Sequence, residues 1–471
     1  MSQLHFFVIS FPAQSHINPA LQFAKRLIRT GAHVTFITSV SAHRRMTKTA
    51  TLDGLTYASF SDGYDDVFLP SYDFLHYMTQ LKRCSSQALT DLTMAAANER
   101  RPVTCIFYNF LLSWVAELAR DLHVPSAVLW IQPAALLDLY YFYLNGYGDL
   151  IRENNKDPSF SIELPGLPVL TSRDLPSFLL PSDENLSQPH VMPFVQELFQ
   201  NLKKETKARV LVNSFEALEV EALKAIDKFS IVAIGPLIPS AFSDGKDSSD
   251  TSFGGDMMIG SSRDYIDWLD SKPEASVVYV SFGTTSVLSK DQVREIAKGL
   301  LESRRPFLWV IRPTPANGKE EEEKEMVENM EELKKNGMMV PWCSQVEVLC
   351  HPSIGCFVTH CGWNSTLESL VAGVPMVTFP QWSDQATNAK LIKDVWKTGL
   401  RLDLNKEGLV EGDEIKRCVE IVMKGENGEE MRRNAKRWKE LAREAVMDGG
   451  SSDKNLQALV DEVRSLQSLS L

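Results

Sequence analysis

The sequence predicts an α/β protein of two domains, each built around a parallel sheet. At 471 residues the chain is long for one domain and comfortable for two. Short apolar runs, which suit strands buried on both faces, alternate with helical stretches along the chain. Such a run opens each half of the chain, at residues 4–11 and 276–280, and a polar loop and a helix follow it.

The individual elements are predicted from these runs. In the first half, we expect strands at 4–11, 33–38, 55–60, 103–108, 126–131, 209–213 and 231–234, and helices at 20–29, 72–98, 112–122, 133–144, 194–207 and 217–228. In the second half, we expect strands at 276–280, 307–311, 338–341, 357–360, 374–379 and 400–404, and helices from 290, 364, 385, 412, 428 and 453. The strand–helix–strand order predicts right-handed crossovers. No G-x-G-x-x-G follows the first strand, which argues against a dinucleotide-dependent dehydrogenase.

Residues 240–262 are predicted to be a linker, because they are rich in Ser, Gly and Asp. We therefore expect an N-terminal domain at 1–239 and a C-terminal domain at 263–471. Both halves begin with a buried strand and a polar loop. This likeness suggests two Rossmann-like domains that face each other across a cleft.

The composition is that of an ordinary globular protein, with 44% hydrophobic and 23% charged residues. The net charge of −12 and a pI near 5.4 argue against nucleic acid or an anionic membrane as the main partner. Seven cysteines without C-x-x-C spacing indicate neither a zinc site nor a disulfide framework, and favour a reduced cytoplasmic compartment. The apolar runs are too short for a signal peptide or a transmembrane helix. Nothing suggests an interface, so we expect a monomer.

Residues 342–385 combine two strands and a helix with polar side chains where the strands end. One strand ends at His360, and a tight turn leads to Asn364 and Ser365 at the start of the helix. The first turn of a helix offers unpaired N–H groups and the positive end of the dipole, so these residues suit a diphosphate. Open α/β sheets bind ligands in this place.

The same stretch supplies groups for the other parts of a nucleotide sugar. Glu368, one turn into the helix, can accept hydrogen bonds from ribose hydroxyls. Trp342 offers a flat face for a base, and Asp384 and Gln385 suit the hydroxyls of a hexose. Taken singly, Trp342 is more typical of a core residue and His360 of a structural histidine. The ordered set is hard to obtain from packing alone.

The stretch resembles the signature box of plant family 1 UDP-dependent glycosyltransferases, and the resemblance extends over nearly the whole chain. It implies that Trp342 stacks on uracil, that Gln345 lies near the base and ribose, that Glu368 binds ribose, that His360, Asn364 and Ser365 bind the diphosphate, and that Trp363, Asp384 and Gln385 contact the sugar. Cys343, beside Trp342, is included in this donor set. A final Gln in the box usually accompanies glucose, so UDP-glucose is the expected co-substrate.

Residues 281–286 form a hydroxyl-rich turn before a helix. Such a turn can donate to a phosphate or simply cap the helix. Beside the signature stretch we favour a phosphate contact by Thr284. The chain has no D-x-D pair, so we expect fixed dipoles, rather than a metal ion, to stabilise the departing diphosphate. The resembled family has the two-domain GT-B architecture, in which the last helix crosses back onto the first domain.

His16 is the candidate general base. In FPAQSHINP it matches the catalytic histidine of the resembled family, within a loop expected to face the cleft; taken alone, it could equally cap a helix. The family histidine is usually oriented by an aspartate, and Asn109 occupies that place here. Asparagine can orient an imidazole but cannot offset the charge of imidazolium. We therefore expect His16 to be a weakened base.

A weakened base suits an acceptor that needs little deprotonation, such as a carboxylate, and the product would be a glucose ester. The N-terminal half also resembles the subgroup of glucose-ester-forming enzymes and anthocyanin 5-O-glucosyltransferases, through stretches such as YDDVF and WIQPA. The acceptor is thus expected to be a terpenoid or apocarotenoid acid, an acidic hormone or, alternatively, a flavonoid or other phenol. Its pocket is expected to include Phe11, Tyr64, Phe110, Tyr140, Tyr141 and Leu179.

Three other functions stay open at this point. A sugar-nucleotide epimerase of the same fold should carry extra carboxylates in its cleft, and a phosphorylase needs a pyridoxal lysine. A UDP-sugar-binding protein without catalysis is conceivable because of Asn109, although the intact His16 argues against it. We favour inverting, metal-independent transfer of glucose from UDP-glucose.

Overall fold

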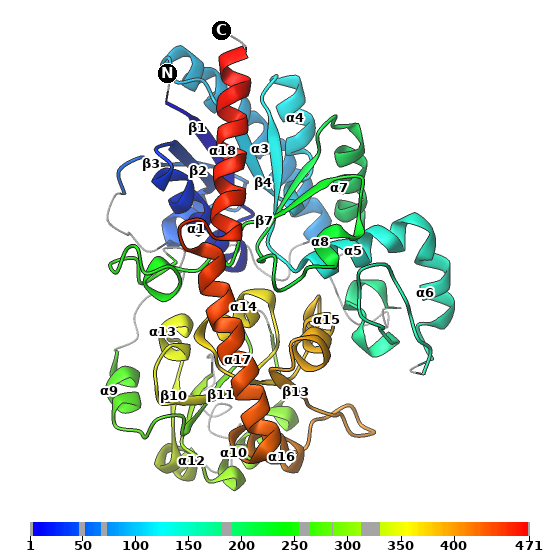
Figure 1. Ribbon diagram of the computed structural model, residues 1–471, viewed down its shortest axis with the longest axis vertical. Coiled ribbons are helices and arrows are strands. Elements are labelled where there is room, and N and C mark those ends of the chain that lie inside the picture. The colour runs from blue at the N-terminus through cyan, green and yellow to red at the C-terminus, as the bar shows by residue number, and fades with distance from the viewer. Residues whose placement is uncertain are drawn as a thin grey trace. The chain divides into compact units, whose positions relative to one another are not determined.

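A computed structural model describes residues 3–46, 52–66, 73–157, 159–180, 191–253, 263–284, 286–311 and 330–469. The chain divides into two compact units (Figure 1). Unit 1 comprises Met1–Ser172, Phe178–Ile259 and Glu444–Leu471, and unit 2 comprises Arg173–Ser177 and Gly260–Arg443. Unit 2 therefore contains one short segment from the first half of the chain.

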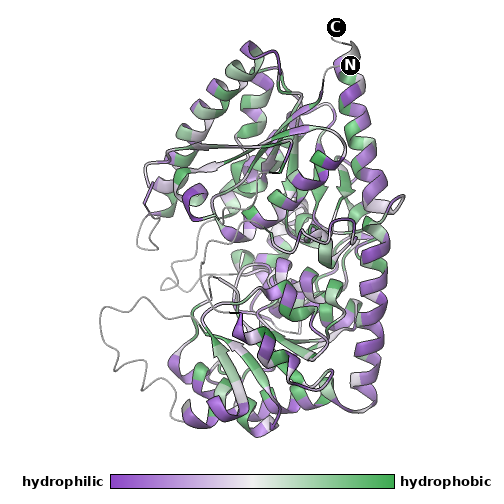
Figure 2. Ribbon diagram, turned by 90° about the vertical axis from the view of Figure 1, so that its left-hand side faces the viewer, coloured by the Kyte–Doolittle hydropathy of each residue, from purple (hydrophilic) through white to green (hydrophobic). Residues whose placement is uncertain are grey.

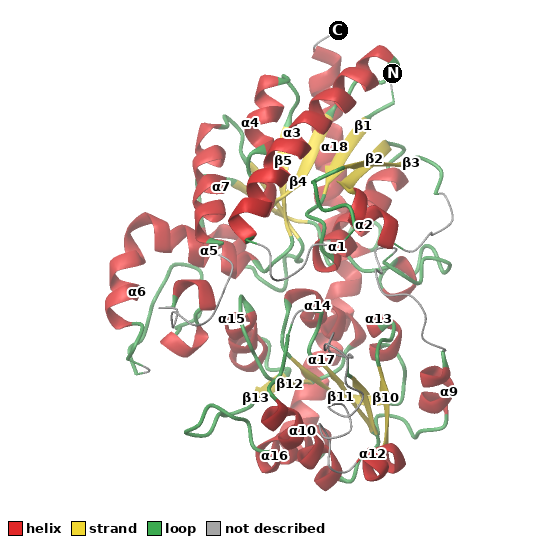
Figure 3. Cartoon of the chain, turned by 180° about the vertical axis from the view of Figure 1, so that it is seen from behind, coloured by secondary structure: helices red, strands yellow, loops and turns green. Residues whose placement is uncertain are grey.

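Unit 1 is built on a parallel sheet with helices on both faces (Figure 3). Its strands are β1 His5–Ile9, β2 His33–Ser39, β3 Leu55–Phe60, β4 Cys105–Asn109, β5 Ser126–Trp130, β6 Arg209–Val212 and β7 Ser230–Ala233. Its helices are α1 Gln14–Arg29, α2 Val40–Arg45, α3 Phe74–Asn98, α4 Val115–Asp121, α5 Ala134–Phe142, α6 Gly148–Asn154, α7 Met192–Lys204, α8 Ala222–Ala225 and α18 Ser451–Leu469. The shorter helical turns η1 Phe110–Leu112, η2 Tyr143–Tyr147 and η5 Ser240–Phe242 also belong to unit 1. Two further turns, η3 Ser172–Asp174 and η4 Ser177–Leu179, contribute only Ser172 and Phe178–Leu179 to it.

The order of the strands fixes where a ligand can bind unit 1. Within the described ranges, seven strands lie in the order β3-β2-β1-β4-β5-β6-β7, and all neighbouring pairs are parallel. The order reverses between β1 and β4, whose residues are all buried. Ligands of such sheets bind beyond the carboxyl ends of the strands at this reversal. That place is occupied by the loops after Ile9 and Asn109.

Unit 2 repeats this design. Its strands are β8 Val277–Ser281, β9 Phe307–Val310, β10 Gly337–Val340, β11 Ile354–Thr359, β12 Met376–Thr378 and β13 Gly399–Arg401. Its helices are α9 Asp264–Asp270, α10 Lys290–Ser303, α12 Met330–Asn336, α13 Gln345–Leu349, α14 Trp363–Ala372, α15 Gln385–Lys390 with the wider turn η6 Leu391–Val395, α16 Gly412–Met423 and most of α17 Gly425–Val446. The described strands lie in the order β10-β9-β8-β11-β12-β13, all parallel. The reversal between β8 and β11 directs a ligand to the loops after these two strands.

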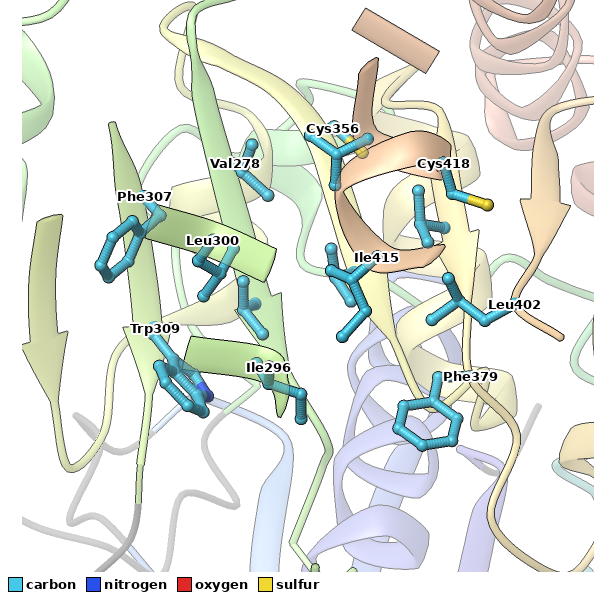
Figure 4. Packing of buried hydrophobic residues seen from close by; sticks show 14 of the residues in the cluster. Val278, Ile296, Leu300, Phe307, Trp309, Cys356, Phe379, Leu402, Ile415 and Cys418 are labelled. Carbon is cyan, nitrogen blue, oxygen red and sulfur yellow. The ribbon is translucent and has the colours of Figure 1, made fainter. Parts of the chain in front are cut away.

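A buried apolar layer joins α10 and α16 to the sheet of unit 2 (Figure 4). It includes Val278 and Phe307 from the strands and Ile296, Leu300 and Ile415 from the helices. Each fully buried side chain of this kind contributes roughly 1.5–3 kcal/mol. This layer anchors the strands, so the loops at their carboxyl ends can carry polar residues.

The last two helices are amphipathic, as their striped colouring shows (Figure 2). Residues 425–443 of α17 belong to unit 2, and α18 belongs to unit 1. There α18 packs on β7, where Ser452 Oγ donates to the Gly235 carbonyl at 2.6 Å and Glu462 pairs with Arg209. None of the described helices is both long and apolar enough to cross a membrane.

The structure differs from two sequence-based expectations. Helix α1 begins at Gln14 rather than residue 20 and continues through Pro19, which lies inside the helix at the cost of one backbone hydrogen bond. His16 therefore lies on a helix and not in a loop. The described part of the expected linker, residues 240–253, is an ordered loop of unit 1, in which buried Asp244 and Asp250 pair with Arg29 and Lys25 at 2.9 and 2.5 Å. Residues 254–262 of that linker lie outside the described residues.

Candidate active site

His16 lies in the first turn of α1, directly beyond β1, at the strand reversal of unit 1. Two aromatic rings flank its imidazole: Phe11 at 5.1 Å between centroids, and Phe110, stacked at 6.0 Å. The next strand of the sheet ends at Asn109, which is buried beside the same ring. The structure thus brings together both predicted catalytic residues and two predicted pocket residues.

Asn109 holds its place through its backbone neighbours. Its Oδ1 accepts a hydrogen bond from the Leu111 N–H at 3.2 Å and so caps η1. Its Nδ2 has no hydrogen-bond partner among the described residues. A buried amide donor of this kind needs a water molecule or a ligand. Asn109 therefore lies beside the imidazole with an amide donor that no described residue accepts.

Desolvation lowers the pKa of His16 to about 4, and the Asn109 carboxamide acts in the opposite direction. The N-terminal end of α1 adds a positive potential that also disfavours imidazolium. His16 is consequently neutral at neutral pH. It can accept a proton at once, but a conjugate acid of such low pKa makes it a weak base.

Further aromatic residues extend the His16 group, and two of them were not predicted. Tyr77 lies 6.3 Å from Phe11 and 5.3 Å from Tyr64 between ring centroids, and its hydroxyl donates to buried Asp62 at 3.3 Å. Trp130 lies 4.8 Å from Phe110 and 6.4 Å from Tyr140. Neither Tyr77 nor Trp130 could be predicted from the sequence, because their contacts with Phe11 and Phe110 depend on how separate elements pack.

The other two predicted pocket residues have different surroundings. Tyr141 packs with Phe199 and Phe229, at 5.5 and 5.9 Å between centroids. Its predicted pocket role has no support from these contacts. Leu179 is buried in η4.

In unit 2, His360 lies beyond β11 between two glycines. A Cβ added at Gly283 would lie 2.4 Å from its Nε2, and one added at Gly362 would lie 2.6 Å from the same atom. Gly283 follows β8 with a φ of +72°, and Gly362 is the N-cap of α14. The imidazole is therefore held at the strand reversal, between the loop carrying Thr284 and the helix start at Asn364 and Ser365.

Gln345 links the parts of the predicted donor set. Its Nε2 donates to Ser365 Oγ at 2.8 Å and to Glu368 Oε2 at 2.9 Å. Its Oε1 accepts from the Tyr279 hydroxyl at 3.3 Å. The same hydroxyl lies 3.4 Å from Cys343 Sγ, and burial raises the pKa of that thiol to about 12. Cys343 is thus a neutral packing group, and Tyr279 is a partner that the sequence did not reveal.

We expect Tyr279→Phe to raise the Kd for UDP several-fold. The change leaves Gln345 Oε1 without this donor and loosens the amide that holds Glu368, at a cost of about 1 kcal/mol. Calorimetric titration with UDP measures the effect. Tyr57→Phe, on the sheet of unit 1, is the matched control, and an equal loss in both variants would contradict a specific role for Tyr279.

Asp384 and Gln385 open α15 and are both buried. Gln385 Oε1 accepts from the N–H groups of Gln381 and Trp382 at 2.7 and 3.0 Å, which turns its amide nitrogen outward from this loop. Asn388 Nδ2 donates to Asp384 Oδ2 at 2.9 Å and to the Cys361 carbonyl at 2.8 Å. Asn388, which was not predicted, therefore ties this loop to the turn before α14. Burial raises the pKa of Asp384 to about 6.

The two tryptophans of the donor set differ in exposure. Trp342 is half-buried after β10, so its ring is not a core residue. The Trp363 ring is buried and lies 6.0 Å from that of Trp396. A ligand at the start of α14 would meet the backbone of Trp363 rather than its indole. No group of three or more His, Cys, Asp or Glu side chains in the described ranges is arranged to hold a metal ion.

Two doubly wound sheets, with a histidine at one strand reversal and a helix start, a buried glutamate and a polar loop at the other, define a GT-B glycosyltransferase. The sequence family described as UDP-glucoronosyl and UDP-glucosyl transferase matches residues 254–442. The chain belongs to this family, and it is a UDP-glucosyltransferase that acts on a small acceptor.

The similar proteins span the whole chain. Phloretin 4'-O-glucosyltransferase of Malus domestica is 58% identical and covers 99% of each chain. A crocetin glucosyltransferase of Gardenia jasminoides, named chloroplastic, is 56% identical and covers 98% of each. The crystal structure of Os79 from O. sativa in complex with UDP superposes with a TM-score of 0.84, at 33% identity, over 97% of this chain and 100% of that one. Anthocyanidin 3-O-glucoside 5-O-glucosyltransferases are also among the relatives, so the predicted family, subgroup and fold class are confirmed.

Proposed function

We propose that this protein transfers glucose from UDP-glucose to the carboxylate of a small apolar plant metabolite, with inversion and without a metal ion, through His16. The carrying observation is the pairing of His16 with Asn109 at the strand reversal of unit 1, together with the low pKa of that histidine. A phenol is the second candidate acceptor. It is favoured by the relative named for phloretin 4'-O-glucosylation.

The donor would be held by the linked groups of unit 2. Trp342 offers its half-exposed ring to uracil, and Glu368, fixed by Gln345, accepts from the ribose hydroxyls. The N-terminus of α14, with Ser365 and His360, would bind the diphosphate, joined by Thr284. Asp384 and the amide nitrogen of Gln385 would bind glucose hydroxyls. These fixed donors would stabilise charge on the departing UDP without a metal ion.

In the reaction, the acceptor oxygen forms a bond to C1 of glucose as the bond from C1 to the diphosphate breaks. UDP leaves with the electron pair. A phenol must also lose a proton, which His16 would take as general base. A carboxylate is already ionised at neutral pH, so its reaction does not require His16 to remove a proton. The weakened His16 therefore favours ester formation.

The Asn109→Asp variant tests the role of this position. A carboxylate beside the imidazole stabilises its charged form, so we expect the acid limb of kcat/KM to move up by about 1–2 pH units. The rate on phenols should rise, and the rate on carboxylates should change little. Aspartate at position 109 still accepts the hydrogen bond from the Leu111 N–H. Asn109→Ala loses this acceptor as well, so comparing the two variants separates the effect of the new charge from the loss of the cap. Unchanged rates on phenols would show that Asn109 is not the orienting position.

A hydroxycinnamic acid tests the proposed acceptor, because one apolar molecule offers a phenol and a carboxylate. The products of UDP-glucose turnover would be treated with mild alkali, which cleaves esters and leaves phenolic glucosides intact. Mainly alkali-labile product supports ester formation. Mainly alkali-stable product would overturn the carboxylate preference in favour of the phenol. If no acceptor is glucosylated at all, the protein would be a UDP-sugar-binding protein without catalytic activity.

The remaining expectations join this proposal. Activity should persist in excess EDTA, since the proposed donors to the diphosphate come from the protein.

We propose a monomer, to be checked by light scattering. The seven cysteines are all free, which suits a reduced compartment such as the cytoplasm. A fluorescent fusion tests that location against the chloroplast.

A further inference from the structure

The segment Arg173–Ser177, which we call the strap, belongs to unit 2 although both of its flanking residues, Ser172 and Phe178, belong to unit 1. It thus joins two stretches of unit 1 through an insertion into unit 2. Its contacts converge on the loop 381–385, which carries Asp384 and Gln385, and on the residues just after it.

Asp174 anchors the strap in the interior of unit 2. Its side chain is 6% exposed, and one carboxylate oxygen pairs with Arg401 Nη1 at 2.9 Å. The other oxygen lies 3.9 Å from Lys390 Nζ. The backbone adds two bonds: Thr387 Oγ1 donates to the Asp174 carbonyl at 2.7 Å, and Arg401 Nη2 donates to the Arg173 carbonyl at 2.8 Å. Both α15 and β13 therefore hold the strap in a fixed position.

Ser177, at the other end of the strap, forms two hydrogen bonds with the backbone of Ser383 in the loop 381–385. The Ser177 N–H donates to the Ser383 carbonyl at 3.0 Å, and the Ser383 N–H donates to Ser177 Oγ at 2.8 Å. Ser383 has a φ of +60°, a left-handed conformation that is unfavourable for residues with a side chain. The two bonds stabilise this conformation directly before Asp384.

The conformation of Ser383 decides where the next two side chains point. Asp384 and Gln385 are held by bonds within the same loop and α15, so a change in the backbone at Ser383 would move both together. We infer that Ser177, supported by Asp174, is a positioning residue for the sugar subsite of the donor. The inference rests on the proposed function, in which Asp384 and Gln385 bind the hexose.

Ser177→Ala tests this inference, because it removes the acceptor for the Ser383 N–H and keeps the backbone bond. UDP lacks the sugar. A residue that acts only on the sugar subsite should therefore change the KM for UDP-glucose but not the Kd for UDP. We expect the KM for UDP-glucose to rise about fivefold to tenfold while the Kd for UDP stays within about twofold. The preference for UDP-glucose over UDP-galactose should fall as well. Asp174→Asn, which weakens the anchor, should act in the same direction.

Two further variants serve as the negative and the positive control for this experiment. Ser271→Ala, which removes a serine hydroxyl from the end of α9, should leave all values unchanged. Gln385→Ala should raise the KM for UDP-glucose without changing the Kd for UDP. If Gln385→Ala has this effect and Ser177→Ala has none, the strap does not position the subsite. If neither has it, the proposed sugar contact itself fails. An equal loss of UDP and UDP-glucose binding in Ser177→Ala would indicate general damage and overturn the inference.

Discussion

Replacing His16 with alanine is expected to lower kcat/KM on a phenolic acceptor by about 10²–10⁴-fold, the usual contribution of a general base. On a carboxylate acceptor the loss should be much smaller, because no proton has to be removed. The Kd for UDP should not change, since the donor groups lie in unit 2. UDP release measures the rates, and calorimetry measures binding.

His76→Ala is the matched control for this variant. His76 is exposed on α3, so its loss should leave the rates and the binding of UDP unchanged. A phenol rate in His16→Ala equal to that of the unaltered protein would show that another group takes the proton. An equal loss on both kinds of acceptor would show that His16 positions the acceptor and does not act as a base.

Replacing Gly283 with alanine is expected to raise the Kd for UDP by about 10–100-fold. The added Cβ would lie 2.4 Å from His360 Nε2 and 2.6 Å from its Cε1, so the imidazole must move. The loop is also constrained, because its φ of +72° strains any residue with a side chain. Loss of one charge-assisted hydrogen bond to the diphosphate, worth about 1.5–3 kcal/mol, would produce a change of this size.

Gly408 provides the control for backbone strain. Its φ of +79° is similar, but a Cβ at this position meets nothing within 4 Å. Gly408→Ala should therefore lose stability without losing affinity for UDP. Equal affinity in Gly283→Ala and Gly408→Ala would mean that His360 does not contact the diphosphate.

The strands could be predicted well because each one is a short apolar run. The alternation of strands and helices also predicted parallel sheets. It did not predict the order of the strands or the places of reversal, which come from the structure. The start of α1 was missed because Asn18 and Pro19 resemble a break, whereas the helix continues through Pro19 despite the lost hydrogen bond. The ordered loop at 240–253 was missed for a related reason, since Ser, Gly and Asp form compact turns as readily as linkers.

The candidate site was predictable where it lies on one continuous stretch. Residues 342–385 carry most of the expected donor set. The ends of strands and helices indicated ligand-binding positions there, and the resemblance to the family implied the individual roles of residues such as Gln345 and Trp363. Tyr279, Asn388, Trp130 and Ser177 could not be predicted, because each acts through a hydrogen bond or ring contact with a residue distant in sequence. Such contacts depend on how the elements pack, which the hydrophobic pattern does not specify.

The pH dependence of kcat/KM on a phenol that ionises only near pH 10 tests the central claim most directly. The acid limb reports the protonation of groups that turnover needs in the free protein. Its His16 component is the part that disappears in His16→Ala, which separates it from the titration of Asp384, whose pKa burial raises to about 6. We expect the His16 component well below the ordinary histidine value of 6.5, near a pKa of about 4. Protein returned from each pH to pH 7 should regain full activity, which excludes irreversible inactivation, and far-UV circular dichroism at each pH checks that the protein stays folded. A His16 component at 6.5 or above would contradict the claim that His16 is a buried, weakened base beside Asn109.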